Sequence, residues 1–88
     1  MSQIVIYSTG ACPFCIRARM FFERRNLEFE DIRIDLQPNF RMEMEQRSRR
    51  TSVPQIFIGD VHVGGYDDMV ELDMDGKLDD LLNGVTNK

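Results

Sequence analysis

Two cysteines three positions apart are the residues of this chain best suited to chemistry. Cys12 and Cys15 enclose Pro13 and Phe14, and the chain has no other cysteine. Proline at the first position of a helix costs no hydrogen bond, so this run predicts a helix that begins just after Cys12. The first turn of a helix offers unpaired N–H groups and a partial positive charge, which stabilise a thiolate. Because the thiolate is the attacking species, the pattern predicts redox chemistry.

The two cysteines are expected to have different roles. Cys12, at the start of the helix, is the predicted nucleophile. Cys15 lies one turn further along the same face, where it can attack a mixed disulfide on Cys12 and release the captured partner. A disulfide between the two should form and be reduced easily.

Two other interpretations compete with redox chemistry. The cysteines could be buried structural residues, although their place at a predicted helix start favours function over accident. They could also form half of a zinc site, but structural zinc normally has four protein ligands. Only His62 could add a third ligand, and the sequence has no fourth thiol or imidazole. The sequence therefore predicts no metal site.

The elements that position the cysteines follow from hydrophobic patterning and turn residues. In order, the prediction is a strand at 4–7, a helix at 13–25, a strand at 30–34, a charged and exposed helix at 39–49, strands at 55–58 and 61–63, a helix at 67–75 and a short helix around 78–82. The first strand–helix–strand unit implies a parallel pair, and Gly59-Asp60 indicates a hairpin. The result is an α/β fold with a four-stranded mixed β-sheet flanked by helices.

Side-chain placement follows from the same patterns. Four residues are assigned to the apolar face of the first helix: Phe14, Ala18, Phe21 and Phe22. Five methionines are expected to fill the core or helix faces: Met20, Met42, Met44, Met69 and Met74. The tail at 86–88 is expected to fray.

Length and charge limit the classes of function. A chain of 88 residues predicts a single domain over 1–88. Its net charge of -4 and pI of about 4.8 argue against nucleic acid as a main partner. The charge is uneven, because 1–50 holds nine arginines and seven acidic residues, whereas 51–88 holds two lysines and eight acidic residues. A solvated mixed-charge surface is the simplest interpretation, although the contrast would suit a ligand that carries both signs.

The expected setting is the cytoplasm. No apolar run approaches the roughly 20 residues that cross a bilayer, and the N-terminal residues lack the pattern of a signal peptide. One close cysteine pair in such a chain favours redox chemistry over structural disulfides.

Three segments together resemble the glutaredoxin family, whose members have the thioredoxin fold. They are the cysteine pair with its enclosed residues, 51–58 (Thr-Ser-Val-Pro-Gln-Ile-Phe-Ile) and 64–68 (Gly-Gly-Tyr-Asp-Asp), in the order and spacing of the family. The resemblance covers about four-fifths of the chain, from the first strand through the third predicted helix.

The resemblance implies a glutathione site opposite the cysteines. Pro54 would follow a cis peptide bond, and the Val53 backbone would pair with the extended tripeptide like an added strand. Without the resemblance, the sequence slightly favours a trans proline that closes a helix, and the resemblance reverses this preference.

The start of the third predicted helix would bind the γ-glutamyl end of glutathione. Gly65 would let the backbone approach the ligand, and Tyr66 would form a wall of the site. Asp67 and Asp68 would pair with the ammonium group, while N–H groups of the helix start hold the carboxylate. Asp67 could instead be only a helix N-cap.

Two positions depart from the family pattern. Thr9 stands where many dithiol glutaredoxins have a lysine that binds the glycyl carboxylate, and Arg49 or Arg50 is a candidate replacement. Phe14 stands where tyrosine is more common, and its ring can still cover the site.

The implied function is glutathione-dependent reduction of protein disulfides and glutathione mixed disulfides by a monomer. Glutathione would be the co-substrate, with no tightly bound cofactor, and the partners would be disulfide-containing or glutathionylated proteins. One alternative is a thioredoxin-like protein reduced by a flavoprotein reductase, although Gly-Pro between the cysteines and a preceding Trp are absent. Another is a dimer that holds an iron–sulfur cluster between two Cys12 thiolates, against which both Pro13 and Cys15 argue.

Overall fold

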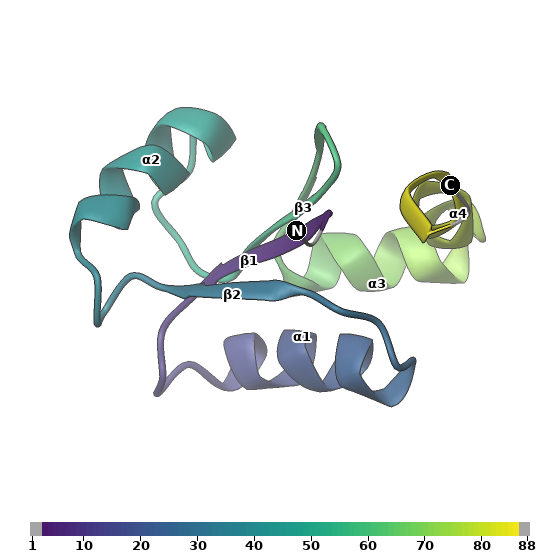
Figure 1. Ribbon diagram of the computed structural model, residues 1–88, viewed down its shortest axis with the longest axis horizontal. Coiled ribbons are helices and arrows are strands. Elements are labelled where there is room, and N and C mark those ends of the chain that lie inside the picture. The colour runs from purple at the N-terminus through teal and green to yellow at the C-terminus, as the bar shows by residue number, and fades with distance from the viewer. Residues whose placement is uncertain (1–2, 87–88) are drawn as a thin grey trace.

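A computed structural model describes residues 3–86, with 85 and 86 described by their backbone alone (Figure 1). The elements are β1 (Ile4–Ser8), α1 (Pro13–Arg24), β2 (Glu30–Arg33), α2 (Asn39–Ser48), β3 (Gln55–Ile58), β4 (Val61–Gly64), α3 (Tyr66–Met74) and α4 (Lys77–Thr86). The predicted order of elements is confirmed, with boundaries shifted by at most one residue except at the end of α4, which lies four residues beyond the predicted short helix. Of the tail expected to fray, Thr86 ends α4 and the other residues lie outside the described range.

The four strands form one mixed sheet in the order β2-β1-β3-β4. β1 and β2 are parallel, as expected when a helix such as α1 connects them. β3 lies antiparallel to β1 and to β4, and Gly59, with φ of 59°, turns the chain between β3 and β4. The predicted four-stranded mixed sheet is therefore confirmed, and β4 is an edge strand.

Helices cover both faces of the sheet, and α1 and α2 lie on opposite sides of it (Figure 1). The larger core joins β1, β3 and β4 to α1, α3 and α4. Its buried residues are Ile4, Ile6, Ala18, Phe22, Ile56, Ile58, Val63, Met69, Leu78 and Leu82. The smaller core packs α2 against the other face and contains Tyr7, Ile32, Ile34, Met44 and Phe57. Successive side chains of β1 therefore point alternately into the larger and the smaller core.

Several side-chain placements differ from the sequence prediction. Phe14 does not belong to the buried face of α1, because 46% of its surface is exposed. Of the five methionines, Met44 and Met69 are buried, and the other three are exposed. The charged α2 is not wholly exposed either, because Met44 reaches the sheet. None of the helices within residues 3–86 has both the length and the apolar character needed to span a bilayer.

Phe22 is the aromatic side chain that joins α1 to the sheet, and it is fully buried. We expect Phe22→Ala to lower the free energy of unfolding by about 3–5 kcal/mol, because it leaves a cavity in the larger core. Met74→Ala, at a position that is 81% exposed, should change it by less than about 0.5 kcal/mol. Urea unfolding of both variants measures the difference, and equal losses would contradict the assignment of Phe22 to the core.

Candidate active site

Cys12 occupies the position that the sequence predicts, at the start of α1. It is the N-cap residue, with extended backbone angles, and Pro13 is the first residue of the helix. The Cys15 backbone N–H donates to Cys12 Sγ over 3.4 Å, so the sulfur satisfies one of the free donors of the first turn. The Cys12 thiol in turn faces the backbone carbonyl of Val53 at 3.8 Å.

The two cysteines lie in different surroundings. Cys12 is half-buried, whereas Cys15 is fully buried, and both are free thiols in this structure. Accessibility alone therefore makes Cys12 the sulfur that an incoming disulfide meets first.

The same surroundings move the pKa values of the two thiols in opposite directions. Partial burial opposes ionisation of Cys12, but hydrogen bonds from Cys15 and from the Phe14 backbone, together with the charge of Arg19, outweigh it and lower the Cys12 pKa. The pKa of Cys15 is raised to about 11, chiefly by burial and also by the nearby Cys12 sulfur, against a hydrogen bond from the Thr9 backbone. Of the two thiols, Cys12 is therefore the one that ionises first as the pH rises.

Arg19 is a contributor to this site that the sequence pattern did not distinguish from the other arginines. It lies one turn after Cys15 on α1, and its charge favours the thiolate form of both cysteines. Its guanidinium donates to Ser8 Oγ at 3.0 Å and lies 3.4 Å from Asp31 Oδ2. Ser8 is fully buried and also donates to Asp31, so strands β1 and β2 hold the guanidinium in place. The spacing of four residues from Cys15 would have indicated this placement.

The loop between β1 and α1 is tied to the end of β2. The Gly10 backbone N–H donates to Asp35 Oδ2 at 3.1 Å, and Arg33 forms a two-pronged pair with Asp35 at 2.7 and 2.8 Å. Arg33 lies so close to Gly10 that a Cβ atom there would stand 2.2 Å from its Nη2. A side chain at this position would therefore have to displace the end of the Arg33 side chain.

The segment of Val53 and Pro54 faces Cys12 through the Val53 carbonyl, as the family resemblance implies. The peptide bond between them is cis, so the alternative of a trans proline that closes a helix is wrong. The helix before them, α2, instead ends at Ser48, and Arg49 adopts left-handed backbone angles with φ of 59°. Ser48 Oγ accepts from the Arg50 backbone N–H, which directs the chain from α2 toward Pro54.

A pocket of about 230 Å³ lies beside this segment. Its lining contains most of the residues predicted to bind glutathione, including the candidate Arg50, and one residue that was not predicted, Ser52. The full lining is Phe14, Arg50, Ser52, Val53, Pro54, Gly65, Tyr66, Asp67 and Asp68. The rings of Phe14 and Tyr66 lie 6.2 Å apart between centroids, which agrees with a wall formed by both. Thr9 and Arg49 are not in this lining, and Thr9 instead reaches Cys15 through its backbone.

The start of α3 differs in detail from the prediction. Its N-cap is Gly65, not Asp67, and Asp68 accepts a hydrogen bond from the Gly65 backbone N–H at 2.9 Å. The glycine that the backbone requires is Gly64, where φ is 109° and a Cβ atom would stand 2.4 Å from Asp68 Oδ2. At Gly65 a Cβ atom would make only ordinary contacts at 3.7 Å. Asp67 is thus exposed in the first turn and not used for capping.

Arg50 is the basic residue of the pocket. Its Nη1 atom lies 2.8 Å from Asp68 Oδ2, and this pair, with the Gly65 hydrogen bond, lowers the pKa of Asp68. Since a guanidinium has five N–H donors, this pairing leaves others that can meet an anionic ligand. Among the described residues, no group of three or more His, Cys, Asp or Glu is arranged to hold a metal ion.

A mixed sheet with two thiols at the start of its first helix defines a dithiol protein of the thioredoxin fold. The family model described as Glutaredoxin matches residues 4–63. A glutaredoxin of Pseudomonas aeruginosa is 46% identical over 83 residues, which cover 94% of this chain and 99% of that protein. Glutaredoxin 3 of Escherichia coli strain K12 is 44% identical over 82 residues, which cover 93% of this chain and 99% of that protein.

Solved structures show the same relationship. The solution structure of glutaredoxin from Brucella melitensis has a TM-score of 0.78 at 46% identity, and the match covers 100% of this chain and 94% of that one. The crystal structure of a buckwheat glutaredoxin–glutathione complex has a TM-score of 0.86 at 28% identity, covering 94% of this chain and 78% of that one. The chain belongs to the glutaredoxin family, and this membership implies thiol–disulfide oxidoreductase activity.

Arg19 provides a test of the electrostatics of the site. We expect Arg19→Gln to raise the pKa of Cys12, because the variant removes a positive charge that favours the thiolate. The rate of alkylation by iodoacetamide rises with pH through this pKa, so the profile should move to higher pH. Arg24→Gln, an equal loss of charge at the exposed end of α1, is the matched control. Identical profiles for the two variants would contradict a role for Arg19.

Proposed function

We propose that this protein reduces glutathione mixed disulfides and protein disulfides, with glutathione as the electron donor. The observation that carries the proposal is a Cys12 sulfur with a lowered pKa that faces the Val53 carbonyl beside a pocket lined by both Arg and Asp. Glutathione carries two carboxylates and one ammonium group, so a pocket with charges of both signs suits it.

Reduction of a glutathione mixed disulfide needs only Cys12. Its thiolate attacks the glutathione sulfur, the S–S bond breaks, and the target protein leaves as a thiolate that takes up a proton. A second glutathione thiolate then attacks the sulfur bound to Cys12. A new disulfide bond joins the two glutathione molecules, and the bond to Cys12 breaks. Oxidised glutathione then leaves, and Cys12 returns to its thiolate form. The incoming glutathione is the reductant, because its thiol sulfur enters a disulfide while the sulfur of the target protein returns to a thiol.

Reduction of a protein disulfide also uses Cys15. Cys12 attacks one sulfur of the substrate, and Cys15 then loses its proton and attacks Cys12 Sγ, which releases the reduced substrate. Capture of the substrate removes the charge from Cys12, and with it one influence that raises the pKa of Cys15. The captured state therefore favours ionisation of the resolving thiol. Two glutathione molecules then reduce the Cys12–Cys15 disulfide.

The pocket supports a definite orientation for glutathione. Its cysteinyl backbone would pair with the Val53 backbone beside Cys12. The ammonium group would meet Asp67, which is exposed and has no ion pair within the described part of the chain. The neighbouring carboxylate would meet the N–H groups at the start of α3, and Arg50 would bind a carboxylate with its remaining donors. We place this activity in the cytoplasm, with a monomer acting on glutathionylated and disulfide-containing proteins.

The two cysteines can be separated by substitution. We expect Cys12→Ser to abolish turnover, because it removes the nucleophile. Cys15→Ser should keep reduction of a small glutathione mixed disulfide but lose reduction of a protein disulfide. A glutathione-coupled assay on both substrates measures this difference. Turnover by Cys12→Ser would show that the roles are wrong, and reduction only by a thioredoxin reductase would show that glutathione is not the donor.

Asp67 tests the binding of glutathione separately from the chemistry. We expect Asp67→Asn to raise the KM for glutathione about 2- to 5-fold with little change in kcat, as the loss of one exposed ion pair implies. Asp60→Asn, the same change in the turn between β3 and β4, is the control. An unchanged KM in the Asp67 variant would place the ammonium group elsewhere.

A further inference from the structure

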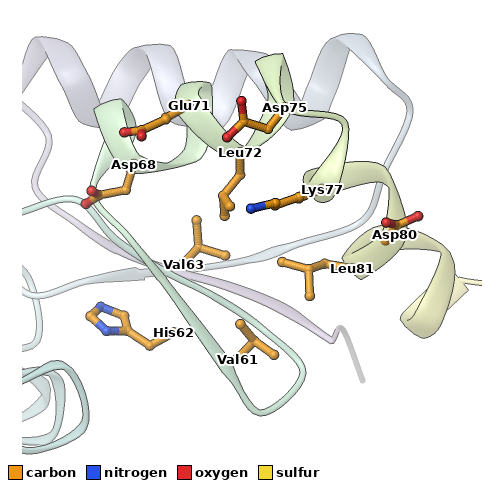
Figure 2. A pocket seen from close by; sticks show the side chains of 10 residues that line it. All are labelled: Val61, His62, Val63, Asp68, Glu71, Leu72, Asp75, Lys77, Asp80 and Leu81. Carbon is orange, nitrogen blue, oxygen red and sulfur yellow. The ribbon is translucent and has the colours of Figure 1, made fainter.

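A second and larger hollow lies outside the pocket assigned to glutathione. It has a volume of about 580 Å³ and lies between the edge strand β4 and the helices α3 and α4 (Figure 2). Ten residues line it: Val61, His62, Val63, Asp68, Glu71, Leu72, Asp75, Lys77, Asp80 and Leu81. We call this hollow the β4 groove.

The β4 groove has an apolar floor and an acidic rim. Figure 2 shows the side chains of Val63, Leu72 and Leu81 gathered in its middle, with the Glu71 and Asp75 carboxylates along α3 beside them. Asp80 adds a carboxylate from α4, and Lys77 is the one cation of the lining. The groove therefore offers contact area for aliphatic side chains and an excess of negative charge at its border.

The carboxylates of the rim are available to a partner. Glu71, Asp75 and Asp80 make no ion pair with any residue that the structure describes, whereas Asp68 is already paired with Arg50. The acidic excess of 51–88 noted in the sequence is thus partly concentrated around one hollow. A positively charged partner fits this rim, and a negatively charged one is repelled.

The wall formed by β4 favours an extended occupant. β4 is the last strand of the sheet order, and no described strand lies on its outer side. An edge strand presents backbone N–H and C=O groups that can pair with an extended peptide. Val61 at the beginning of this edge is 43% exposed, so apolar surface accompanies the backbone groups.

The β4 groove adjoins the active site. Asp68 lines both the groove and the pocket beside Val53 and Pro54. A chain segment that lies along β4 therefore extends toward the site where Cys12 would attack its disulfide.

We propose that the β4 groove binds an extended segment of the substrate protein that carries Lys or Arg side chains near the reducible cysteine. The aliphatic parts of these side chains contact the apolar floor, and their charged ends meet the carboxylates of the rim. This inference rests on the proposed function, because it names the class of protein disulfide that the same site reduces best.

The test uses two disulfide-bonded peptides that share one cysteine pair and differ only in flanking lysines or glutamates. At low salt we expect a higher kcat/KM for the lysine peptide. The double variant Glu71→Gln/Asp75→Asn should lose about 1.5- to 5-fold per carboxylate on that peptide, mainly through KM. The matched control Asp60→Asn/Asp79→Asn removes the same charge outside the groove and should retain the preference. Equal loss in both double variants, or no preference in the native protein, would overturn the proposal.

Two further measurements separate this proposal from the proposed function. Turnover of a small glutathione mixed disulfide should be the same in both double variants. If the native protein lacked this turnover, the result would contradict the proposed function but not the binding of a peptide in the β4 groove. Binding is measured without chemistry by adding a lysine peptide that lacks cysteine to the Cys12→Ser protein. Amide NMR shifts in β4 and α3 that saturate and weaken with salt would support the groove. Shifts elsewhere, or salt-dependent self-association blocked by Glu71→Gln/Asp75→Asn, would overturn it.

Discussion

The hydrogen bond from the Cys15 backbone N–H to the Cys12 sulfur is the contact on which the site depends. It exists because Cys12 is the last residue outside α1 and Pro13 the first inside it. The position of that helix is set in turn by Ala18 and Phe22, which are buried against the sheet. The sulfur therefore meets the donors of the helix start only when the larger core has formed. The geometry of the Cys12–Cys15 pair therefore depends on the packing of α1 against the sheet, and not only on the residues of the pair.

Asp68 connects regions that lie far apart in the sequence. Its carboxylate accepts from the Gly65 backbone and from Arg50, so it joins the start of α3 to the segment that follows α2. The close approach of Asp68 also explains why Gly64 must lack a side chain. This one residue shapes the pocket beside Pro54 and borders the β4 groove.

The sequence predicts the fold well because its patterns are local. Pro13 after Cys12 and Gly59 before Asp60 determine where a helix begins and where a hairpin turns, whatever the rest of the chain does. Side-chain environment is harder to predict, because it depends on elements brought together by folding. Phe14 has the right spacing for the buried face of α1, yet its side chain is largely exposed and its ring lies beside that of Tyr66 instead.

The missed details of the site have the same origin. Arg19 acquires its role from Ser8 and Asp31 on two neighbouring strands. The choice between Arg49 and Arg50, which the sequence left open, is decided by the end of α2, which directs Arg50 into the pocket. A single sequence contains no record of these pairings. The capping of α3 by Gly65 was obscured because Asp67 is itself a favourable N-cap type.

The position of Arg19 also has a thermodynamic consequence. Its positive charge stabilises a negative sulfur, and only the dithiol state contains one, since the disulfide is neutral. The interaction that makes Cys12 a ready nucleophile therefore also shifts the equilibrium between disulfide and dithiol toward the dithiol. Stabilising the reduced form makes a redox couple more oxidising. The charge that favours attack by Cys12 therefore also makes the Cys12–Cys15 dithiol a weaker reductant. A dithiol oxidoreductase with such a residue depends on a plentiful thiol pool to drive reduction forward.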